Sequence, residues 1–120
     1  MSARILVVDD EDILIRCYRR ILDEGGYQVD YARSGRDALK SAAASQFDLI
    51  VLDYLMPEMN GMEVLQRLKE LHSDVRVIMV TGLDQIDTEI RAKELGVFDY
   101  LAKPFDPDDL KRAVERALVK

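Results

Sequence analysis

Short apolar runs alternate along the chain with longer stretches that have helical periodicity. Three runs are dense in Val, Ile and Leu, as strands buried on both faces usually are: ILVVD (5–9), LIVLD (49–53) and VRVIMVT (75–81). Two others, YQVDYA (27–32) and VFDYLAK (97–103), alternate more between apolar and polar residues, which is typical of strands nearer a sheet edge. The pattern predicts five strands, three of them fully buried.

Helical periodicity predicts five helices, one after each strand. In chain order they span residues 11–24, 35–45, 61–72, 85–95 and 107–119. The last helix is the clearest, because its apolar residues recur at the spacing of one helix face and because Asp106 and Pro107 form a typical helix start. The fourth helix is the weakest, since only Ile86, Ile90 and Leu95 are spaced to form an apolar face.

The regular alternation of strand and helix predicts an α/β fold, in which a doubly wound parallel sheet has helices on both faces. A length of 120 residues, of which 48% are hydrophobic, suits one domain with one modest core. The sequence has no internal repeat, low-complexity tract or linker. Residues 1–120 are therefore expected to form a single domain.

The composition excludes several classes of protein. A net charge of −6 argues against a nucleic-acid-binding surface, because a phosphate backbone needs clusters of Lys and Arg. No apolar run approaches the roughly 20 residues that a membrane span requires, and the start MSARILVVDD does not have the form of a signal peptide. Cys17 is the only cysteine, so no internal disulfide can form, which suits a reducing compartment. The cytoplasm is the expected location.

Chemically active side chains stand at the ends of four predicted strands. Asp9 and Asp10 follow the first strand, Asp53 ends the third, Thr81 ends the fourth, and Lys103 ends the fifth. In open α/β sheets, binding sites lie just beyond the carboxyl ends of the strands. Each residue alone has an ordinary explanation, as a helix cap, a turn residue or a solvated charge. Together they predict a site at one edge of the sheet.

The charges in this set indicate the chemistry. Three carboxylates gathered within several ångströms repel one another and raise one another's pKa values. A hard divalent cation, Mg²⁺ or Mn²⁺, relieves this repulsion and leaves positions for phosphate oxygens. The Lys103 ammonium and the Thr81 hydroxyl can contact the oxygens of a transferring phosphoryl group. Asp53 then becomes a nucleophile that forms an aspartyl-phosphate.

The ordered set of motifs resembles the receiver domain of bacterial two-component response regulators, in the CheY-like superfamily, from Arg4 to Val119. The matching segments are VVDDED, LDYLMPEMNG, VTG and DYLAKPF. The resemblance implies a flavodoxin-like (βα)5 fold with strand order 2-1-3-4-5. It also implies a cation bound by Asp9, Asp10, Asp53 and the main-chain carbonyl of Leu55.

The resemblance further implies a phosphorylation-activated switch. Asp53 would accept a phosphoryl group from a histidine kinase or a phosphotransfer protein, and the domain would promote its own phosphorylation and dephosphorylation without acting as an enzyme on other substrates. Thr81 and the mobile aromatic Tyr100 would then alter the surface of the fourth helix, fifth strand and fifth helix. That surface would control an output domain, a partner or a homodimer. The family commonly has a cis bond where Lys103-Pro104 stands, and no output domain is expected within this chain.

The first helix carries more apolar residues than one face needs. Leu14, Cys17, Tyr18 and Ile21 are expected to face inward, with Ile13 and Ile15 on opposite flanks. The surplus is either ordinary edge packing or a docking patch for a helical partner. In the resembled family, this helix and the loop after Lys103 receive the histidine-bearing partner. The expected docking residues are Ile13, Leu14, Cys17, Pro104 and Phe105.

Other classes of protein fit less well. A flavin-binding domain needs a Ser/Thr/Gly phosphate loop after the first strand, where this chain has acids. A haloacid-dehalogenase-type phosphatase needs a second acid two residues after the nucleophile, where Leu55 stands. A receiver-like module that binds partners without phosphorylation is a third alternative, although all the site residues are present. An EF-hand fails because the acidic stretch lacks the mid-loop Gly and the terminal Glu.

Three smaller expectations concern single residues. Asn60-Gly61 is expected to supply positive φ in the turn between strand and helix. His72, the only histidine, is expected to be a solvated residue at a helix end. The resemblance implies that the side chains two residues after Asp53 and two after Thr81 flank the approach of a hydrolytic water. Here they are Leu55 and Leu83, which cannot orient it by hydrogen bonding. We therefore expect slow loss of the phosphoryl group, over minutes to hours.

Overall fold

The computed structural model describes residues 2–82 and 86–119, the side chains of Ile86 and Asp87 excepted. The strands are β1 (Arg4–Val8), β2 (Gln28–Ala32), β3 (Leu49–Asp53), β4 (Arg76–Thr81) and β5 (Asp99–Ala102). The helices are α1 (Asp12–Asp23), α2 (Gly35–Ala44), α3 (Gly61–Leu71), α4 (Ile86–Glu94) and α5 (Pro107–Leu118). All ten predicted elements are confirmed, with ends that differ by at most two residues.

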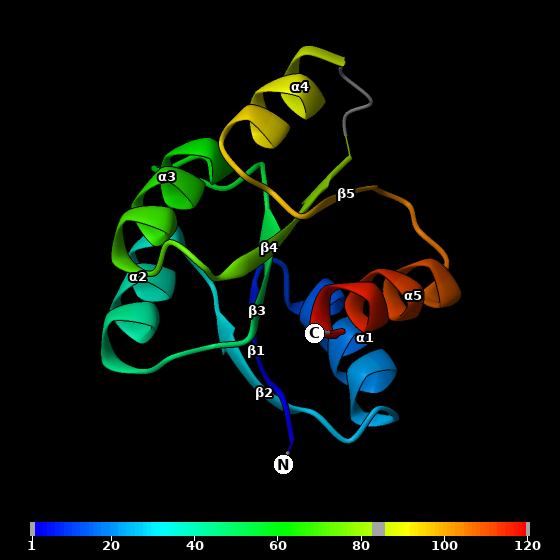
Figure 1. Ribbon diagram of the computed structural model, residues 1–120. Helices are drawn as coiled ribbons and strands as arrows, with labels where there is room; N and C mark the ends of the chain where they lie inside the picture. The colour runs from blue at the N-terminus through cyan, green and yellow to red at the C-terminus, as the bar shows by residue number, and fades with distance from the viewer. Residues whose placement is uncertain (1, 83–85, 120) are drawn as a thin grey trace.

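The five strands form one parallel sheet in the order β2-β1-β3-β4-β5 (Figure 1). The expected α/β fold and the strand order 2-1-3-4-5 are both confirmed. The register places Ile5 of β1 opposite Val29 of β2 on one side and opposite Leu49 of β3 on the other. β1 and β3 are therefore neighbours in the middle of the sheet, and their carboxyl ends lie side by side.

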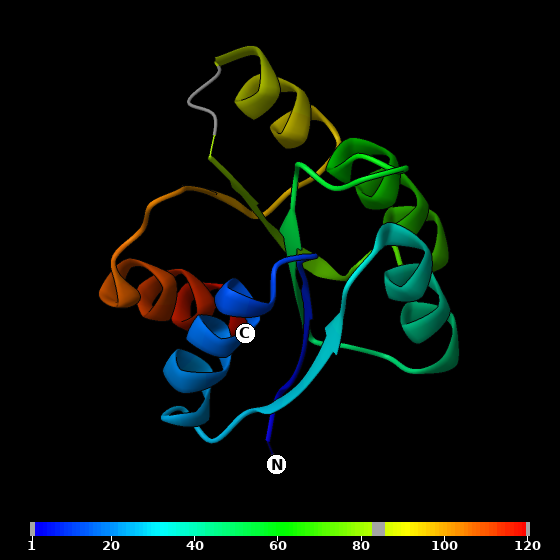
Figure 2. The same ribbon diagram turned by 180° about the vertical axis from the view of Figure 1, so that it is seen from behind.

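Helices cover both faces of the sheet, as the two views in Figures 1 and 2 show. α1 and α5 pack on one face, and α2, α3 and α4 pack on the other. Successive residues of β3 point to opposite faces of the sheet. Leu49 and Val51 belong to the core under α1 and α5, whereas Ile50 and Leu52 belong to the core under α2, α3 and α4. β3 is buried on both faces because it is the central strand, which explains its uninterrupted apolar sequence.

The predicted inward face of α1 is wrong in part. Ile15 is buried together with Tyr18, and Cys17 is exposed, whereas the expectation placed Cys17 inside and Ile15 on a flank. Residues 13–15 are all apolar, so the spacing of three and four residues fits two phases of the helix equally well. Packing against the sheet selects the phase that buries Ile15, which leaves Ile13 73% exposed.

The apolar face predicted for α4 is wrong at Ile90, whereas Leu95, just beyond the helix, packs against the core as expected. Ile90 is 50% exposed, and the buried residues among the described side chains of the helix are Thr88 and Ala92. The side chain of Ile86 lies outside the described part of the structure. The buried side chains in the described part of α4 are therefore small, and they bury less apolar area than the residues facing the sheet from the other helices.

His72 is not the solvated residue that its position suggested. It ends α3, is half-buried, and its Nε2 lies 2.8 Å from the carbonyl oxygen of Ala42 in α2. This hydrogen bond joins the carboxyl-terminal ends of the two helices. None of the helices in the described part of the chain is long and apolar enough to cross a membrane.

Candidate functional site

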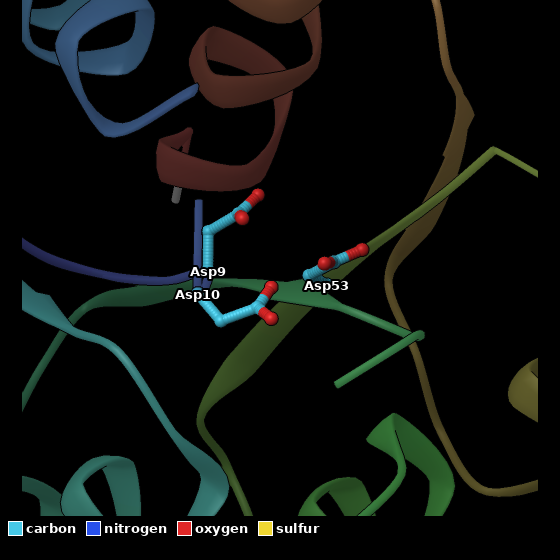
Figure 3. A group of neighbouring side chains, drawn as sticks. All are labelled: Asp9, Asp10 and Asp53. Atoms are coloured by element: carbon cyan, nitrogen blue, oxygen red, sulfur yellow. The ribbon is translucent and has the colours of Figure 1, made fainter. Parts of the chain in front are cut away.

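The carboxylates expected to form the site do come together. Asp9 and Asp10 follow β1, and Asp53 is the last residue of the neighbouring β3, so all three side chains project from adjacent strand ends (Figure 3). One carboxylate oxygen from each lies within 4.8 Å of the others. Parallel pairing of β1 and β3 is the cause, because it brings both carboxyl ends to the same edge of the sheet.

The two buried carboxylates share a single ammonium. Asp9 is fully buried and Asp53 is 3% exposed. The Lys103 Nζ lies 3.2 Å from Oδ1 of Asp53 and 3.4 Å from Oδ2 of Asp9. The main-chain N–H of Glu11 donates to the other oxygen of Asp9 at 2.9 Å. One positive charge thus compensates two buried negative charges, and the exposed Asp10 adds a third.

Burial and mutual repulsion raise the pKa values of these acids. Desolvation, the largest cause, and the neighbouring Asp9 together raise the pKa of Asp53 to about 6, although the Lys103 ammonium opposes the shift. Burial also raises the pKa of Asp9, against the hydrogen bond from Glu11 and the charge of Lys103. Without a further cation, the site therefore holds its negative charges at a free-energy cost near neutral pH.

The donor set fits a small divalent cation. Carboxylate oxygens are the ligands that Mg²⁺ and Mn²⁺ prefer, and three of them within 4.8 Å of one another can share one ion. Because Asp10 is exposed, water can complete the coordination shell. The carbonyl of Leu55, two residues beyond Asp53, remains a predicted ligand.

The loop after Asp53 is held close to the strand that precedes it. The N–H of Tyr54 donates to the Val80 carbonyl at 2.8 Å, and the N–H of Gly61 donates to the Tyr54 carbonyl at 2.8 Å. A Cβ at Gly61 would lie 2.7 Å from the Tyr54 Cα and 3.0 Å from the Asp53 carbonyl oxygen. Gly61 is therefore needed because the backbones approach closely.

The expected positive φ at Asn60-Gly61 is wrong. Asn60 has a φ of −78° and is the N-cap of α3, where its side chain accepts from the Glu63 N–H. The left-handed residue of this loop is Glu58, with a φ of 70°. Asn60 therefore caps a helix and Gly61 permits a close backbone contact. An Asn-Gly pair can serve these roles as well as supplying positive φ.

Thr81 ends β4, and Lys103 directly follows the adjacent strand β5 at the same edge of the sheet. The Lys103 N–H donates to the Thr81 carbonyl at 2.7 Å, and the Lys103-Pro104 bond is cis, as the family resemblance implied. Thr81 is fully buried. Tyr100 is half-buried against the core formed with α2, α3 and α4. The predicted switching roles of Thr81 and Tyr100 remain predictions.

The expected docking residues line one groove. Ile13, Leu14 and Cys17 of α1 face Pro104 and Phe105 across a hollow of about 620 Å³. The ring of Phe105 also packs on the buried ring of Tyr18, with centroids 5.9 Å apart. The groove is continuous with the site, because Lys103 lines both.

Sequence reasoning missed three contributions to the site and the groove. The Glu11 N–H orients Asp9, and Glu11, the N-cap of α1, makes no side-chain capping hydrogen bond. Arg16 and Arg20 also line the groove. Their spacing of four residues, beside apolar residues on a predicted helix, is a signal that could have revealed them. Leu83, expected near the attack line of water, lies outside the described residues, whereas Leu55 is 51% exposed.

Comparison with known proteins establishes the class. Residues 5–115 match the response regulator receiver domain. The chain belongs to this family, whose members are two-component signalling regulators.

Individual relatives agree with this assignment. Sporulation initiation phosphotransferase F of Bacillus subtilis is 36% identical over 118 residues, which cover 98% of this chain and 95% of the relative. Transcriptional regulatory protein PcoR of Escherichia coli is 38% identical over 115 residues, which cover 96% of this chain but 51% of the relative. The chain therefore spans about half the length of relatives such as PcoR.

Solved structures support the same assignment. A CheY-like response regulator receiver domain protein from Methanospirillum hungatei has a TM-score of 0.94 at 30% sequence identity, covering 98% of this chain and 94% of that one. The Vibrio cholerae chemotaxis protein CheY4 has a TM-score of 0.92 at 30% identity, covering 98% of this chain and all of that one.

Proposed function

We propose that residues 1–120 form a single receiver domain in which Asp53 accepts a phosphoryl group from a histidine kinase or a phosphotransfer protein. The observation that carries this proposal is the position of Lys103, within 3.4 Å of both Asp9 and Asp53 at the edge of a three-carboxylate cluster. A phosphoryl group on Asp53 would meet this ammonium directly. It would also lie close to Thr81, because Asp53 ends β3 and Thr81 ends the paired strand β4.

The proposed reaction transfers phosphorus from nitrogen to oxygen. An ionised oxygen of Asp53 attacks the phosphorus of a phosphohistidine, and the P–N bond breaks with its electron pair left on the imidazole. If the other ring nitrogen already carries a proton, the imidazole leaves as neutral histidine. Lys103 stabilises the charge on the phosphoryl oxygens, and the Thr81 hydroxyl donates to the same group.

Asp9, Asp10, Asp53 and the Leu55 carbonyl would hold Mg²⁺ or Mn²⁺. When bound, the ion supplies positive charge against the phosphoryl oxygens and the carboxylates. The protein's contribution is to fix the ligands: the Glu11 N–H holds Asp9, and the close contact between Gly61 and Tyr54 holds the loop that carries Leu55.

The proposed output is a change at the surface of α4, β5 and α5. A phosphoryl group that attracts Thr81 would open space beside it for Tyr100, and α4 would reposition. The buried residues among the described side chains of α4 are Thr88 and Ala92, and their displacement would expose little apolar area. The altered surface would act on an output domain, a separate partner or a second copy of the chain. The cytoplasm is the proposed site of action.

Phosphorylation by a small donor tests the assignment of Asp53. With Mg²⁺ and acetyl phosphate, the protein should gain one phosphoryl group by intact-mass measurement, and Asp53→Asn should gain none. Asp23→Asn, at the exposed end of α1, is a control that should react like the parent. If Asp53→Asn reacts as fast as the parent, Asp53 is not the acceptor.

A further inference from the structure

Lys103 begins a loop whose middle has little main-chain restraint. The Lys103 N–H donates to the Thr81 carbonyl at 2.7 Å, which ties the start of the loop to β4. At the other end, Asp106 is the N-cap of α5. Between these points, Pro104 and Phe105 form no main-chain hydrogen bond with other main-chain groups in the described part of the chain. Packing of side chains therefore has to hold the middle of the loop.

Phe105 supplies that packing from the loop, and its aromatic partner is Tyr18 of α1. The ring centroids are 5.9 Å apart and the ring planes are inclined at 33°, a separation within the usual range for interacting aromatic pairs. Tyr18 is 1% exposed and is one of the largest fully buried side chains, whereas Phe105 is half-buried against the same core. A buried, rigid ring on α1 thus limits where Phe105 can lie.

Tyr18 is also close to the reacting groups. Burial, and then the charges of Asp9 and Asp53, raise the pKa of the Tyr18 phenol. The phenol therefore remains neutral near neutral pH and adds no charge to the site. Its ring contacts the loop that begins at Lys103, while its hydroxyl lies in the field of the two buried carboxylates.

The position of the Lys103 ammonium is sensitive to this loop. Its Nζ lies 3.2 Å from Oδ1 of Asp53 and 3.4 Å from Oδ2 of Asp9. A phosphoryl group on Asp53 would need the same ammonium within hydrogen-bond distance of its oxygens, and a positioned charge loses much of its effect when it is displaced. Phe105 is only two residues beyond Lys103, so a loop that shifts at Phe105 also shifts the main chain that carries the ammonium.

We propose that Tyr18 is a positioning residue for phosphoryl transfer: its ring holds Phe105, and Phe105 holds the loop that places the Lys103 ammonium. Tyr18 does not contact the phosphoryl group and acts through Lys103. The inference rests on the proposed function, because it takes Lys103 to stabilise the group transferred to Asp53. An aliphatic side chain at position 18 could also be buried, but it would remove the ring that Phe105 meets.

Substitutions on both sides of the ring contact test the proposal. Phosphorylation is followed by intact mass with Mg²⁺ and acetyl phosphate, a donor that needs no docking surface. Tyr18→Leu should slow the reaction about tenfold, because the ammonium is no longer held in place. Phe105→Leu removes the same contact from the loop and should slow it to a similar extent. Tyr18→Phe restores the ring and should restore the parent rate. If Tyr18→Phe is as slow as Tyr18→Leu, the hydroxyl is responsible and the proposal is overturned.

A double-mutant cycle with Lys103→Gln tests whether Tyr18 acts through Lys103. When the ammonium is absent, Tyr18→Leu should slow the reaction no further, because there is no charge left to misplace. If Tyr18→Leu lowers the rate by the same factor with and without Lys103, the role of Tyr18 is structural and the proposal fails.

Leu22→Ala is the matched control for lost core packing. Leu22 lies one turn beyond Tyr18 on the same face of α1, is 1% exposed and belongs to the same core. This variant should unfold at a lower urea concentration than the parent and still be phosphorylated at the parent rate. Equal slowing by Leu22→Ala and Tyr18→Leu would show a general effect of a weakened core and would overturn the proposal. Failure of the proposed function gives a different result, because a parent that acetyl phosphate cannot phosphorylate would refute the role of Asp53 itself.

Discussion

A hollow of about 600 Å³ lies at each end of the central strands. The charged side chains are balanced by partners at one end and are not balanced at the other. At the amino ends, Arg4 pairs with Asp30 and lies over the Phe47 ring. Arg76 donates to the carbonyl of Ala117, in the last turn of α5, and to that of Val119, just beyond the helix. These charges have partners within the fold.

At the carboxyl ends, three carboxylates share one ammonium. Two of them are buried, where an uncompensated charge is most unfavourable. The comparison teaches that balanced charge in this molecule supports the fold, whereas unbalanced charge marks the place where an ion and a phosphoryl group belong. Variants at the two ends should therefore have different kinds of effect.

The largest difference should come from removing one cation at each end. Lys103→Gln should slow phosphorylation by acetyl phosphate about a hundredfold, because a positioned positive charge is lost from the phosphoryl oxygens. Arg76→Gln should leave that rate unchanged and lower the free energy of unfolding by about 1–2 kcal/mol through lost hydrogen bonds and a lost contact with the Phe98 ring. Rates by mass spectrometry and urea unfolding measure both. If the Arg76 variant were also phosphorylated slowly, the proposed separation between charges that support the fold and charges that serve the site would be wrong.

A second effect concerns the backbone beside the site. Gly61→Ala places a Cβ 2.7 Å from the Tyr54 Cα, so the loop must shift, at about 2 kcal/mol in unfolding free energy. Phosphorylation should slow as well, since the same loop follows Asp53. Gly82→Ala is the matched control, because its nearest contact would be 3.9 Å away, at the Lys103 Cβ. Equal stability of the two variants would show that the close approach does not constrain the loop.

The raised pKa of Asp53 predicts how stability depends on pH when metal is removed. The pKa of this acid is about 6 in the fold and near 3.8 in the unfolded chain, so the folded state binds its proton more tightly. Its favourable contribution is complete below pH 3.8 and is lost as the pH rises through 6. In EDTA, Asp53→Asn should therefore exceed the parent in unfolding free energy by about 2 kcal/mol at pH 7.5, after allowance for solvent screening.

The comparison of that variant at two pH values removes general effects of the substitution. At pH 4.5 the advantage of Asp53→Asn should shrink, because the parent carboxyl is then largely protonated. An advantage that is constant with pH would refute the raised pKa.

The smallest effect concerns the lifetime of the phosphorylated state. Two leucines cannot orient a water for attack, so the parent should lose its phosphoryl group over minutes to hours. Leu55→Asn combined with Leu83→Glu should shorten that lifetime several-fold by offering hydrogen-bonding groups. Loss from the parent within seconds, or no acceleration in the double variant, would count against this role.

Most of the fold could be predicted because its signals are local. The buried strands are continuous apolar runs, and Asp53 and Lys103 stand at strand ends where parallel pairing must bring them together. The family resemblance supplied the strand order. The resemblance also implied that Ile13 and Phe105 share one surface, and both line one groove in the structure.

The errors arose where local patterns allow more than one answer. Apolar residues at 13–15 fit two phases of α1, and only packing against the sheet exposes Cys17. A glycine can be required either for a positive φ or for a close backbone contact. The role of Gly61 could therefore not be assigned without the position of Tyr54. His72 bonds to Ala42, which is 30 residues away, so no local pattern predicts this contact.

The exposed thiol of Cys17 gives this chain a built-in place for a reporter. Because the sequence has one cysteine and it lies on the wall of the groove, a maleimide dye would attach at a single known position without any substitution. A polarity-sensitive fluorophore there should change its emission when a helix covers the groove, while the chemistry at Asp53 is followed separately by mass. Stopped-flow recording could then order the two events in time and show whether the donor leaves before or after the phosphoryl group has moved.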